Sequence, residues 1–277
     1  MSTADLIFIE NCKQILNSGL NDFNQDVRPR WHDGTPAHTL RAFAMVNRYD
    51  LSKEFPAVTL RRLSFKNCVD EILWIWQKKS NQTSQLQSRI WDAWADDSGS
   101  IGKAYGYQLG VKHQYPEGDM DQVDRVLYLL KHDRASRRII TNIYNHQDLH
   151  AMGLYPCAYS MTFVVTDNKL NAILNQRSQD FLTANNWNVA QYSVLTHIFA
   201  QASGLDAGEF VHVIADAHIY DRHIPIVESL IKRVPRQAPK LWINPNVKNF
   251  YEFTADDFKL EDYKPHPSKD LHIEVAV

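Results

Sequence analysis

Apolar positions recur with helical spacing in three long stretches of the chain, at residues 4–19, 64–78 and 188–205. In each stretch the apolar residues lie three or four positions apart, which is typical of a helix that buries one face. The third stretch has the most regular pattern, and Gly204 follows it as a C-terminal stop. The spacing therefore predicts three main helices and a shorter one over residues 225–234.

Alternating apolar and polar positions predict strands. Residues 159–166 and 169–178 alternate with a period of two on either side of an Asp-Asn pair at 167–168, which favours a tight turn. This pattern predicts a β-hairpin, and the mostly apolar residues 209–220 predict a further strand. Because strands and helices are mixed without regular βαβ order, the pattern favours an α+β fold, in a single domain over residues 1–277.

Composition and charge exclude several classes of function. The 277 residues are 44% hydrophobic and carry a net charge of −2, which lacks the basic excess that drives binding to DNA or RNA. No apolar run reaches the ~18 residues of a membrane span, and residues 1–14 lack the features of a signal peptide. Cys12, Cys68 and Cys157 are odd in number and widely spaced, which argues against disulfides. The sequence predicts a cytoplasmic protein without DNA or membrane partners.

Cys157 directly follows a proline at the start of the predicted hairpin. The proline restricts the backbone and so helps to fix the direction of the sulfur. A single cysteine is nevertheless more often a small buried hydrophobe than a nucleophile. Taken alone, Cys157 leaves both interpretations open, and the inert one is favoured.

Two arginine-containing segments are candidates for an anion site. Residues 176–180, QRSQD, contain an Arg-Ser pair that suits a phosphate, although a solvated strand end fits this segment equally well. Arg137 and Arg138 precede an apolar run. Adjacent arginines are more often surface charge than ligands, so this pair is ambiguous.

Other polar residues also have a structural interpretation beside the functional one. His218 and Tyr220 share one face of an extended segment, and Asp216 and His223 lie near them in sequence. Their spacing matches no established metal motif, so a hydrogen-bonding role is favoured over metal binding. Glu71 interrupts an apolar helical pattern and, taken alone, is more typical of an exposed position than of a functional one.

The sequence resembles the thymidylate synthase family in many short blocks that occur in the family's order. The blocks are DGTPAHT (33–39), DEILWIWQ (70–77), IWDAW (90–94), AYGYQLG (104–110), SRRIIT (136–141), LYPCAYS (154–160), QRSQD (176–180), NVAQYSVLTHIFAQ (188–201), GEFVHVIADAHIYDRH (208–223), PKLWINP (239–245) and the ending DFKLEDYKPHP…EVAV. Together they cover nearly the whole chain.

The resemblance implies a fold and a reaction. The family fold is a large twisted mixed sheet with helices packed on one face, and the other face lies at a homodimer interface. The family converts dUMP to dTMP with 5,10-methylenetetrahydrofolate, which supplies a one-carbon unit and a hydride, without metal or nicotinamide. A pyrimidine hydroxymethylase of the same family is the alternative, and a non-catalytic RNA-binding role is disfavoured by the net charge of −2.

The resemblance also implies roles for individual residues. Cys157 matches the nucleophile that adds to C6 of uracil, and Glu71, Tyr105 and Asp180 match the other catalytic positions. The dUMP-binding positions are Arg28, Arg177, Ser178, Gln176, Asn188, His218 and Tyr220, with Arg137 and Arg138 from the partner subunit. The folate-binding positions are Asp180, Trp91 and Val277. Arg30 lies two residues from Arg28, and the resemblance does not decide between them for the phosphate.

Three departures from the commonest family pattern concern the pocket. Ala158 follows the cysteine where many members have histidine, and Ala215 stands where glycine is usual. Residues 183–188 read TANNWN in place of the frequent LGLPFN.

Overall fold

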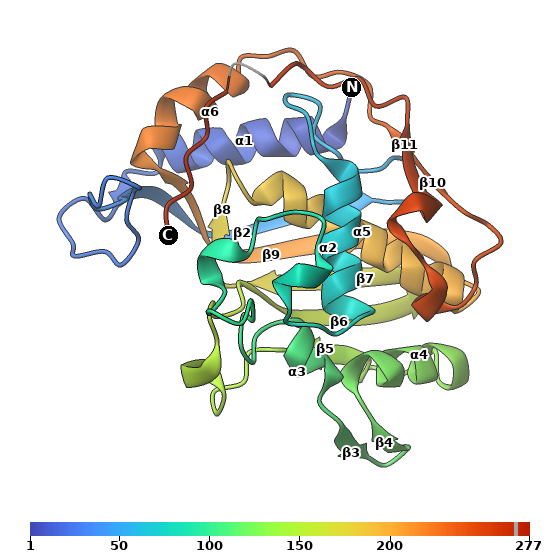
Figure 1. Ribbon diagram of the computed structural model, residues 1–277. Coiled ribbons are helices and arrows are strands. Elements are labelled where there is room, and N and C mark those ends of the chain that lie inside the picture. Colours follow the sequence, from blue (N-terminus) through green and yellow to red (C-terminus); the bar gives the residue numbers. More distant parts are fainter. Residues whose placement is uncertain (269–270) are drawn as a thin grey trace.

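The computed structural model describes residues 1–268 and 271–277, and its centre is one mixed sheet of seven strands (Figure 1). The strand order is β1-β2-β9-β7-β6-β5, and β8 pairs with β9 outside this path. Strands β7 and β9 are parallel, whereas β9 pairs with β2, and β6 with β7 and β5, in antiparallel fashion. The strands are β1 (Leu20–Asn21), β2 (Thr39–Asp50), β5 (Ile140–Asn142), β6 (Ala158–Thr166), β7 (Lys169–Gln176), β8 (Gln179–Asp180) and β9 (Asp206–Tyr220).

Helices cover one face of this sheet. Helix α1 packs on β2 and β9, α5 packs on β7 and β9, and α2 lies against α5. The helices are α1 (Thr3–Asn17), α2 (Phe65–Trp76), α3 (Gly106–Gly110), α4 (Gln122–His132), α5 (Asn185–Ala202) and α6 (Ile224–Leu230). Two small antiparallel hairpins complete the fold: β3 (His113–Tyr115) with β4 (Gly118–Met120), and β10 (Lys240–Ile243) with β11 (Phe258–Glu261). In the part of the chain that the structure describes, none of the helices has the length and apolar character that a membrane crossing requires.

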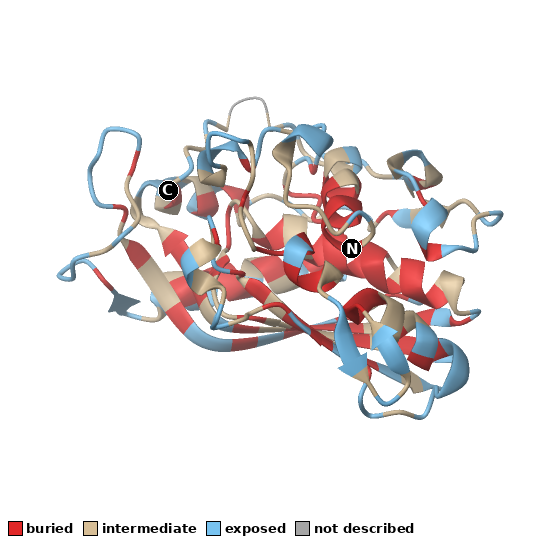
Figure 2. Ribbon diagram, turned by 60° about the horizontal axis from the view of Figure 1, so that its bottom comes forward, coloured by how far each residue is buried: buried red, intermediate tan, exposed pale blue. Residues whose placement is uncertain are grey.

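Helix α5 lies at the centre of the core. It is buried on nearly all sides, because the sheet lies below it and α2 packs against it. Figure 2 shows buried positions concentrated in the middle of the molecule and exposed positions in the surrounding loops and hairpins. The buried set of α5 includes polar residues such as Gln191 and Thr196, so this helix is less one-sided than its spacing predicts.

Most predicted elements are confirmed. The hairpin forms between β6 and β7, and Asp167 and Asn168 occupy its turn with φ values of 47° and 62°. Such positive values at both central residues are typical of a type I′ turn. Helix α5 begins at Asn185, three residues before the predicted start. The mixed α+β architecture with a large mixed sheet is also confirmed.

Strand β2 is the long strand that the pattern did not predict. Its buried positions alternate from Met45 to Tyr49, but Ala44 has a φ of 59°, and both Phe43 and Ala44 are exposed. The residue in the left-handed region changes the alternation of buried positions, although the register with β9 is the same on both sides of it. The irregularity hides the period of two in the sequence.

The face of the sheet opposite the helices carries exposed apolar residues. Val46 on β2 is 57% exposed, Ile140 on β5 is 50% exposed, and Val164 on β6 is 42% exposed. Cross-strand pairing places one row of side chains across this face, from Ile140 through Thr162, Ile173 and Val211 to Arg48. This uncovered face is too apolar to be typical of a surface in contact with water.

The hairpin turn gives a test of the backbone geometry. We expect Asn168→Val to lower the free energy of unfolding by about 1–2 kcal/mol, because a β-branched residue is poorly tolerated at positive φ. Lys169→Val is the matched control, since the first position of β7 is extended and accepts such a residue. Urea unfolding of both variants checks the prediction, and equal stabilities would contradict it.

Candidate active site

Cys157 lies immediately before β6, and two hydrogen bonds fix its backbone. Its amide donates to the hydroxyl of Tyr105 at 3.0 Å, and its carbonyl accepts from the amide of Arg177 at 2.9 Å. Tyr105 comes from the segment that precedes α3, and Arg177 follows β7. Elements far apart in sequence thus hold the half-buried thiol at the end of the strand.

The side chain of Arg177 lies over the sulfur. Its Nη2 is 3.6 Å from Cys157 Sγ, and the guanidinium also donates to the carbonyls of Pro156 at 3.0 Å and Tyr155 at 2.8 Å. Burial raises the pKa of the Cys157 thiol, whereas the charge of Arg177, the Tyr105 hydroxyl and the charge of Arg28 lower it. Burial is the largest of these effects, so the pKa remains above its ordinary value despite the arginines.

The structure distinguishes the two arginines of the early loop. Burial raises the pKa of both Cys157 and Tyr220, and the positive charge of Arg28 opposes this effect at both groups. Arg30 is instead held by its backbone, which exchanges hydrogen bonds of 2.8 and 3.0 Å with Val277. Its side chain donates to the carbonyl of Val27. Of the two, Arg28 is the one whose charge acts on the Cys157 thiol.

A chain of buried amides surrounds Asn188 in the first turn of α5. Its Oδ1 accepts from Nε2 of Gln176 at 3.2 Å and of Gln179 at 3.3 Å, and its Nδ2 donates to Gln191 Oε1 at 3.1 Å. Gln176 Oε1 in turn accepts from Nε2 of His212 at 2.8 Å. Burial lowers the pKa of His212 to about 3, so the ring is neutral at physiological pH. These contacts fix the direction of the Asn188 amide.

Three members of this amide chain, Gln179, Gln191 and His212, were missed by the sequence analysis. All three are buried; Gln191 and His212 lie within mostly apolar segments of α5 and β9, whereas Gln179 belongs to the short polar strand β8. A buried polar side chain needs a hydrogen-bond partner, so its presence in an apolar run is a signal that could have identified Gln191 and His212.

Strand β9 brings His218 and Tyr220 to the same region. Their rings lie 5.2 Å apart, and His218 Nδ1 donates to Asp216 Oδ1 at 3.0 Å. Asp216 also accepts from Arg41 Nε at 2.8 Å. Burial opposes ionisation of Asp216, but the bonds from His218 and Arg41 outweigh it and lower the pKa of the carboxyl. Among the described residues, no three His, Cys, Asp or Glu side chains are grouped to hold a metal ion.

Glu71 is buried on α2, contrary to the interpretation based on this residue alone. Only 5% of the residue is exposed, and its Oε2 accepts from the indole of Trp187 at 3.1 Å. Burial raises the pKa of Glu71 to about 7. An apolar helix face can bury a carboxylate where donors from another helix reach it, which periodicity cannot show.

Trp91 connects α2 with the cysteine region. Its ring lies 4.9 Å from that of Tyr105 and 5.9 Å from that of Trp74. Tyr105 has a φ of 45°, and a Cβ on the following Gly106 would lie 2.4 Å from the Ser80 carbonyl oxygen. Only glycine fits at position 106, so this contact fixes the segment that places the Tyr105 hydroxyl on Cys157.

The remaining predicted residues lie at the margins of this cluster. Asp180 on β8 accepts from the amides of Leu182 at 2.9 Å and Thr183 at 3.0 Å. Ser178 contributes its carbonyl to Gln176 Nε2 at 3.0 Å. Arg137 and Arg138 are exposed between α4 and β5. None of the hydrogen bonds or salt bridges of the described residues joins this arginine pair to the Cys157 cluster.

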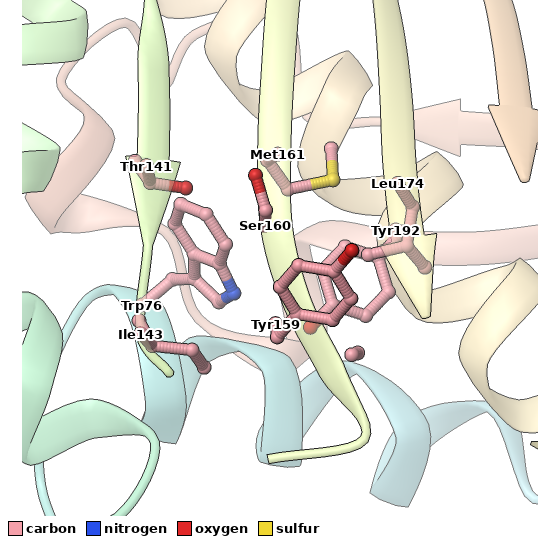
Figure 3. A pocket seen from close by; sticks show the side chains of 9 residues that line it. Trp76, Thr141, Ile143, Tyr159, Ser160, Met161, Leu174 and Tyr192 are labelled. Atoms are coloured by element: carbon pink, nitrogen blue, oxygen red, sulfur yellow. The ribbon is translucent and has the colours of Figure 1, made fainter. Parts of the chain in front are cut away.

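The space beside Ala158 is filled by neighbouring side chains. Figure 3 shows Trp76, Met161, Leu174 and Tyr192 around it, and the gap has no room for a water molecule. Aromatic side chains from α2 and α5 therefore close the space beside Ala158.

The buried carboxyl of Glu71 predicts a pH-dependent cost in stability. Because its pKa rises from 4.5 to about 7 on folding, the protonated form is favoured in the native state, and stability is lost as the pH rises between these values. The loss corresponds to about 3 kcal/mol. We expect Glu71→Gln to exceed the wild type in unfolding free energy at pH 8 and to match it near pH 4.5, as measured by urea unfolding. Glu228→Gln, at an exposed position of α6, is the control, and a gain that is the same at both pH values would contradict the assignment.

Comparison with known proteins identifies the family. The family model "Thymidylate synthase" matches residues 6–277. Thymidylate synthases of Bacillus licheniformis and Bacillus phage phi3T are 45% and 46% identical to the chain, and each alignment covers 100% of both sequences. The structure of thermostable thymidylate synthase A from Bacillus subtilis superposes with a TM-score of 0.93 at 42% identity and covers 99% of each chain. The chain belongs to the thymidylate synthase family.

Proposed function

We propose that this protein catalyses the reductive methylation of dUMP to dTMP, with 5,10-methylenetetrahydrofolate as the donor of the one-carbon unit and the hydride. The observation that carries the proposal is the position of Cys157, with its backbone held by Tyr105 and Arg177 and its sulfur 3.6 Å from the Arg177 guanidinium. The relatives described above are named thymidylate synthases, which favours this reaction over hydroxymethylation.

The chemistry requires a soft nucleophile. The Cys157 thiolate adds to C6 of uracil, which turns C5 into an enolate carbon that can attack the methylene group of the folate. After loss of the C5 proton, tetrahydrofolate leaves and returns a hydride to the exocyclic methylene. Dihydrofolate forms, a methyl group remains on C5, and the sulfur departs from C6. In the free protein, burial keeps the pKa of the Cys157 thiol above its ordinary value. The positive charges of Arg177 and Arg28 oppose this effect and favour the thiolate.

The other residues divide between recognition and proton transfer. Arg28, Arg177 and Ser178 bind the phosphate, together with Arg137 and Arg138 of the partner subunit. Asn188 accepts from N3–H and donates to O4 of uracil, and Gln176 and the other amides around Asn188 fix this orientation. His218 and Tyr220 hold the 3′-hydroxyl.

Five residues complete the reaction centre. Glu71 and Tyr105 order the water molecules and proton transfers at the base, and a carboxyl with a pKa of about 7 suits such a role near neutral pH. Asp180 binds the pterin and Trp91 lines the folate side. Val277 closes the site, supported by its backbone pairing with Arg30, two residues from Arg28.

We also propose that the chain acts as one domain and as a homodimer. One hydrophobic core cluster extends from Ala4 to Phe258, which supports a single domain. The apolar sheet face with Val46, Ile140 and Val164 suits a second copy of the chain. Arg137 and Arg138 are exposed beside β5, a position from which they can reach across such an interface.

Replacement of the nucleophile tests the reaction. We expect Cys157→Ser to lower turnover at least about a thousandfold, roughly 4 kcal/mol in the barrier, because a hydroxyl adds poorly to C6. Binding of dUMP is expected to persist, since the proposed phosphate ligands are unchanged. Cys12→Ala, a buried thiol in α1, is the control that keeps activity. Mass spectrometry of adducts with 5-fluoro-dUMP and methylenetetrahydrofolate checks the prediction. An adduct in the serine variant, or a hydroxymethyl product from the wild type, would contradict it.

A charge on the uncovered sheet face tests the dimer. We expect the wild type to sediment as a dimer at micromolar concentration and Val46→Arg to sediment as a monomer, because the arginine would be desolvated in the interface. Activity is expected to fall with dissociation, since each phosphate site would lose its two arginines from the partner. Val234→Arg is the matched control, because Val234 is 72% exposed and lies after α6, away from the sheet face. A dimeric Val46→Arg variant or a monomeric wild type would count against the interface.

A further inference from the structure

Trp187 lies in the segment where this chain departs from the frequent family pattern, and its indole reaches Glu71. The residue precedes Asn188 in the first turn of α5, and its Nε1 donates to Glu71 Oε2 at 3.1 Å across 116 positions of sequence. The carbonyl of Trp187 accepts from Cys68 Sγ at 3.5 Å, one turn before Glu71 on α2. Two contacts therefore tie this residue to the helix that carries the carboxylate.

The carboxylate of Glu71 has few groups that stabilise its charge. Burial raises the pKa of Glu71 and the negative charge of Asp70 raises it further, whereas contacts with Gln191, Trp187 and Trp91 lower it. The indole Nε1 of Trp91 has no partner within hydrogen-bond distance, and Gln191 Nε2 donates to the Cys68 carbonyl at 3.4 Å. Among the hydrogen bonds of the described residues, the one from Trp187 is the bond that reaches the Glu71 side chain.

The titratable groups around Glu71 offer no compensating positive charge. Asp70 and Cys68 come from its own helix, and Tyr192 comes from α5. Burial raises the pKa of Cys68 and Tyr192, and the charge of Glu71 raises both further. Neutral N–H groups then favour the ionised carboxylate, because a hydrogen bond to a charged group is stronger than one between neutral groups, and the Trp187 indole is the one that reaches Glu71 at hydrogen-bond distance.

We propose that Trp187 is a positioning residue, whose indole N–H orients the Glu71 carboxylate and favours its ionised form beside the Asn188 amide. The phenylalanine of the frequent LGLPFN pattern fills a similar volume but cannot donate. Because Trp187 and Asn188 are consecutive in one helical turn, the same backbone fixes the group that recognises the base and the donor that holds the proton-transfer group. The inference rests on the proposed role of Glu71 in the reaction.

The test replaces the donor and keeps the aromatic ring. In Trp187→Phe, loss of the N–H raises the pKa of Glu71, so the ionised form is reached only at higher pH. We expect the acid limb of kcat/KM for dUMP to move upward by about one pH unit, the effect of one charge-assisted hydrogen bond. On the alkaline side of that limb the activity is expected to stay within about threefold of the wild type. Trp242→Phe, a half-buried indole on β10, is the matched control and leaves the profile unchanged.

A second measurement does not depend on turnover. Urea unfolding across pH 5–9 is compared for the wild type, Trp187→Phe, Glu71→Gln and the double variant. We expect Trp187→Phe to lose more stability above pH 7 than near pH 5, and this pH dependence to vanish in the Glu71→Gln background. If the phenylalanine variant does not fold, benzothienylalanine at position 187 alone keeps the shape of the indole and removes the N–H.

The outcomes separate this inference from the proposed function. An unmoved acid limb with a pH-independent loss of rate would assign Trp187 a packing role and overturn the inference. The same pH-dependent loss of stability in the Glu71→Gln background would overturn it as well. Failure of the wild type to convert dUMP would instead refute the proposed function, and the unfolding series would still test the bond between Trp187 and Glu71.

Discussion

The two hydrogen bonds on the backbone of Cys157 are the constraint on which the site depends. The hydrogen bond from the Cys157 amide to the Tyr105 hydroxyl depends on the positive φ of Tyr105 and on the close contact at Gly106. The hydrogen bond from the Arg177 amide to the Cys157 carbonyl depends on the end of β7 lying beside the start of β6. Each bond alone tolerates some movement, but together they leave the sulfur a narrow range of positions under the Arg177 guanidinium. The surrounding helices and strands hold the Tyr105 hydroxyl and the Arg177 amide at hydrogen-bonding distance from the Cys157 backbone.

Helix α5 explains how a large core can surround so many polar groups. Its first two turns carry Trp187, Asn188 and Gln191, and their polar side chains are hydrogen-bonded to one another or to α2 and β7. A buried amide without partners costs more free energy than a satisfied one contributes. Removal of one member would therefore leave its neighbours without partners and destabilise the whole chain of amides. Rigid recognition of a pyrimidine edge and the stability of the core therefore depend on the same hydrogen bonds.

The sequence allowed some of the main helices and strands to be predicted and the roles to be inferred from family blocks, but it did not predict β2 or α4 and did not show the contacts. The hairpin at Asp167 and Asn168 was predictable because turn chemistry is local. Strand β2 was not, because the left-handed Ala44 breaks its alternation. Glu71 is hydrogen-bonded to Trp187, which lies 116 positions away in the sequence. Asn188 accepts hydrogen bonds from side chains on β7 and β8. A single sequence carries no record of such proximity.

The pairing of β2 with β9 has a consequence for how the chain folds. Their register joins Thr39 to Tyr220 and Asp50 to Glu209, so the partners are separated by about 160 to 180 residues. At the usual rate of synthesis, about 5–20 residues per second, β2 waits roughly 10–30 s before β9 has been made. During that time most of β2 has no neighbouring strand, because β1 pairs only with its first few residues. Such non-local pairing predicts slow folding and a need for protection from aggregation while the chain is being translated.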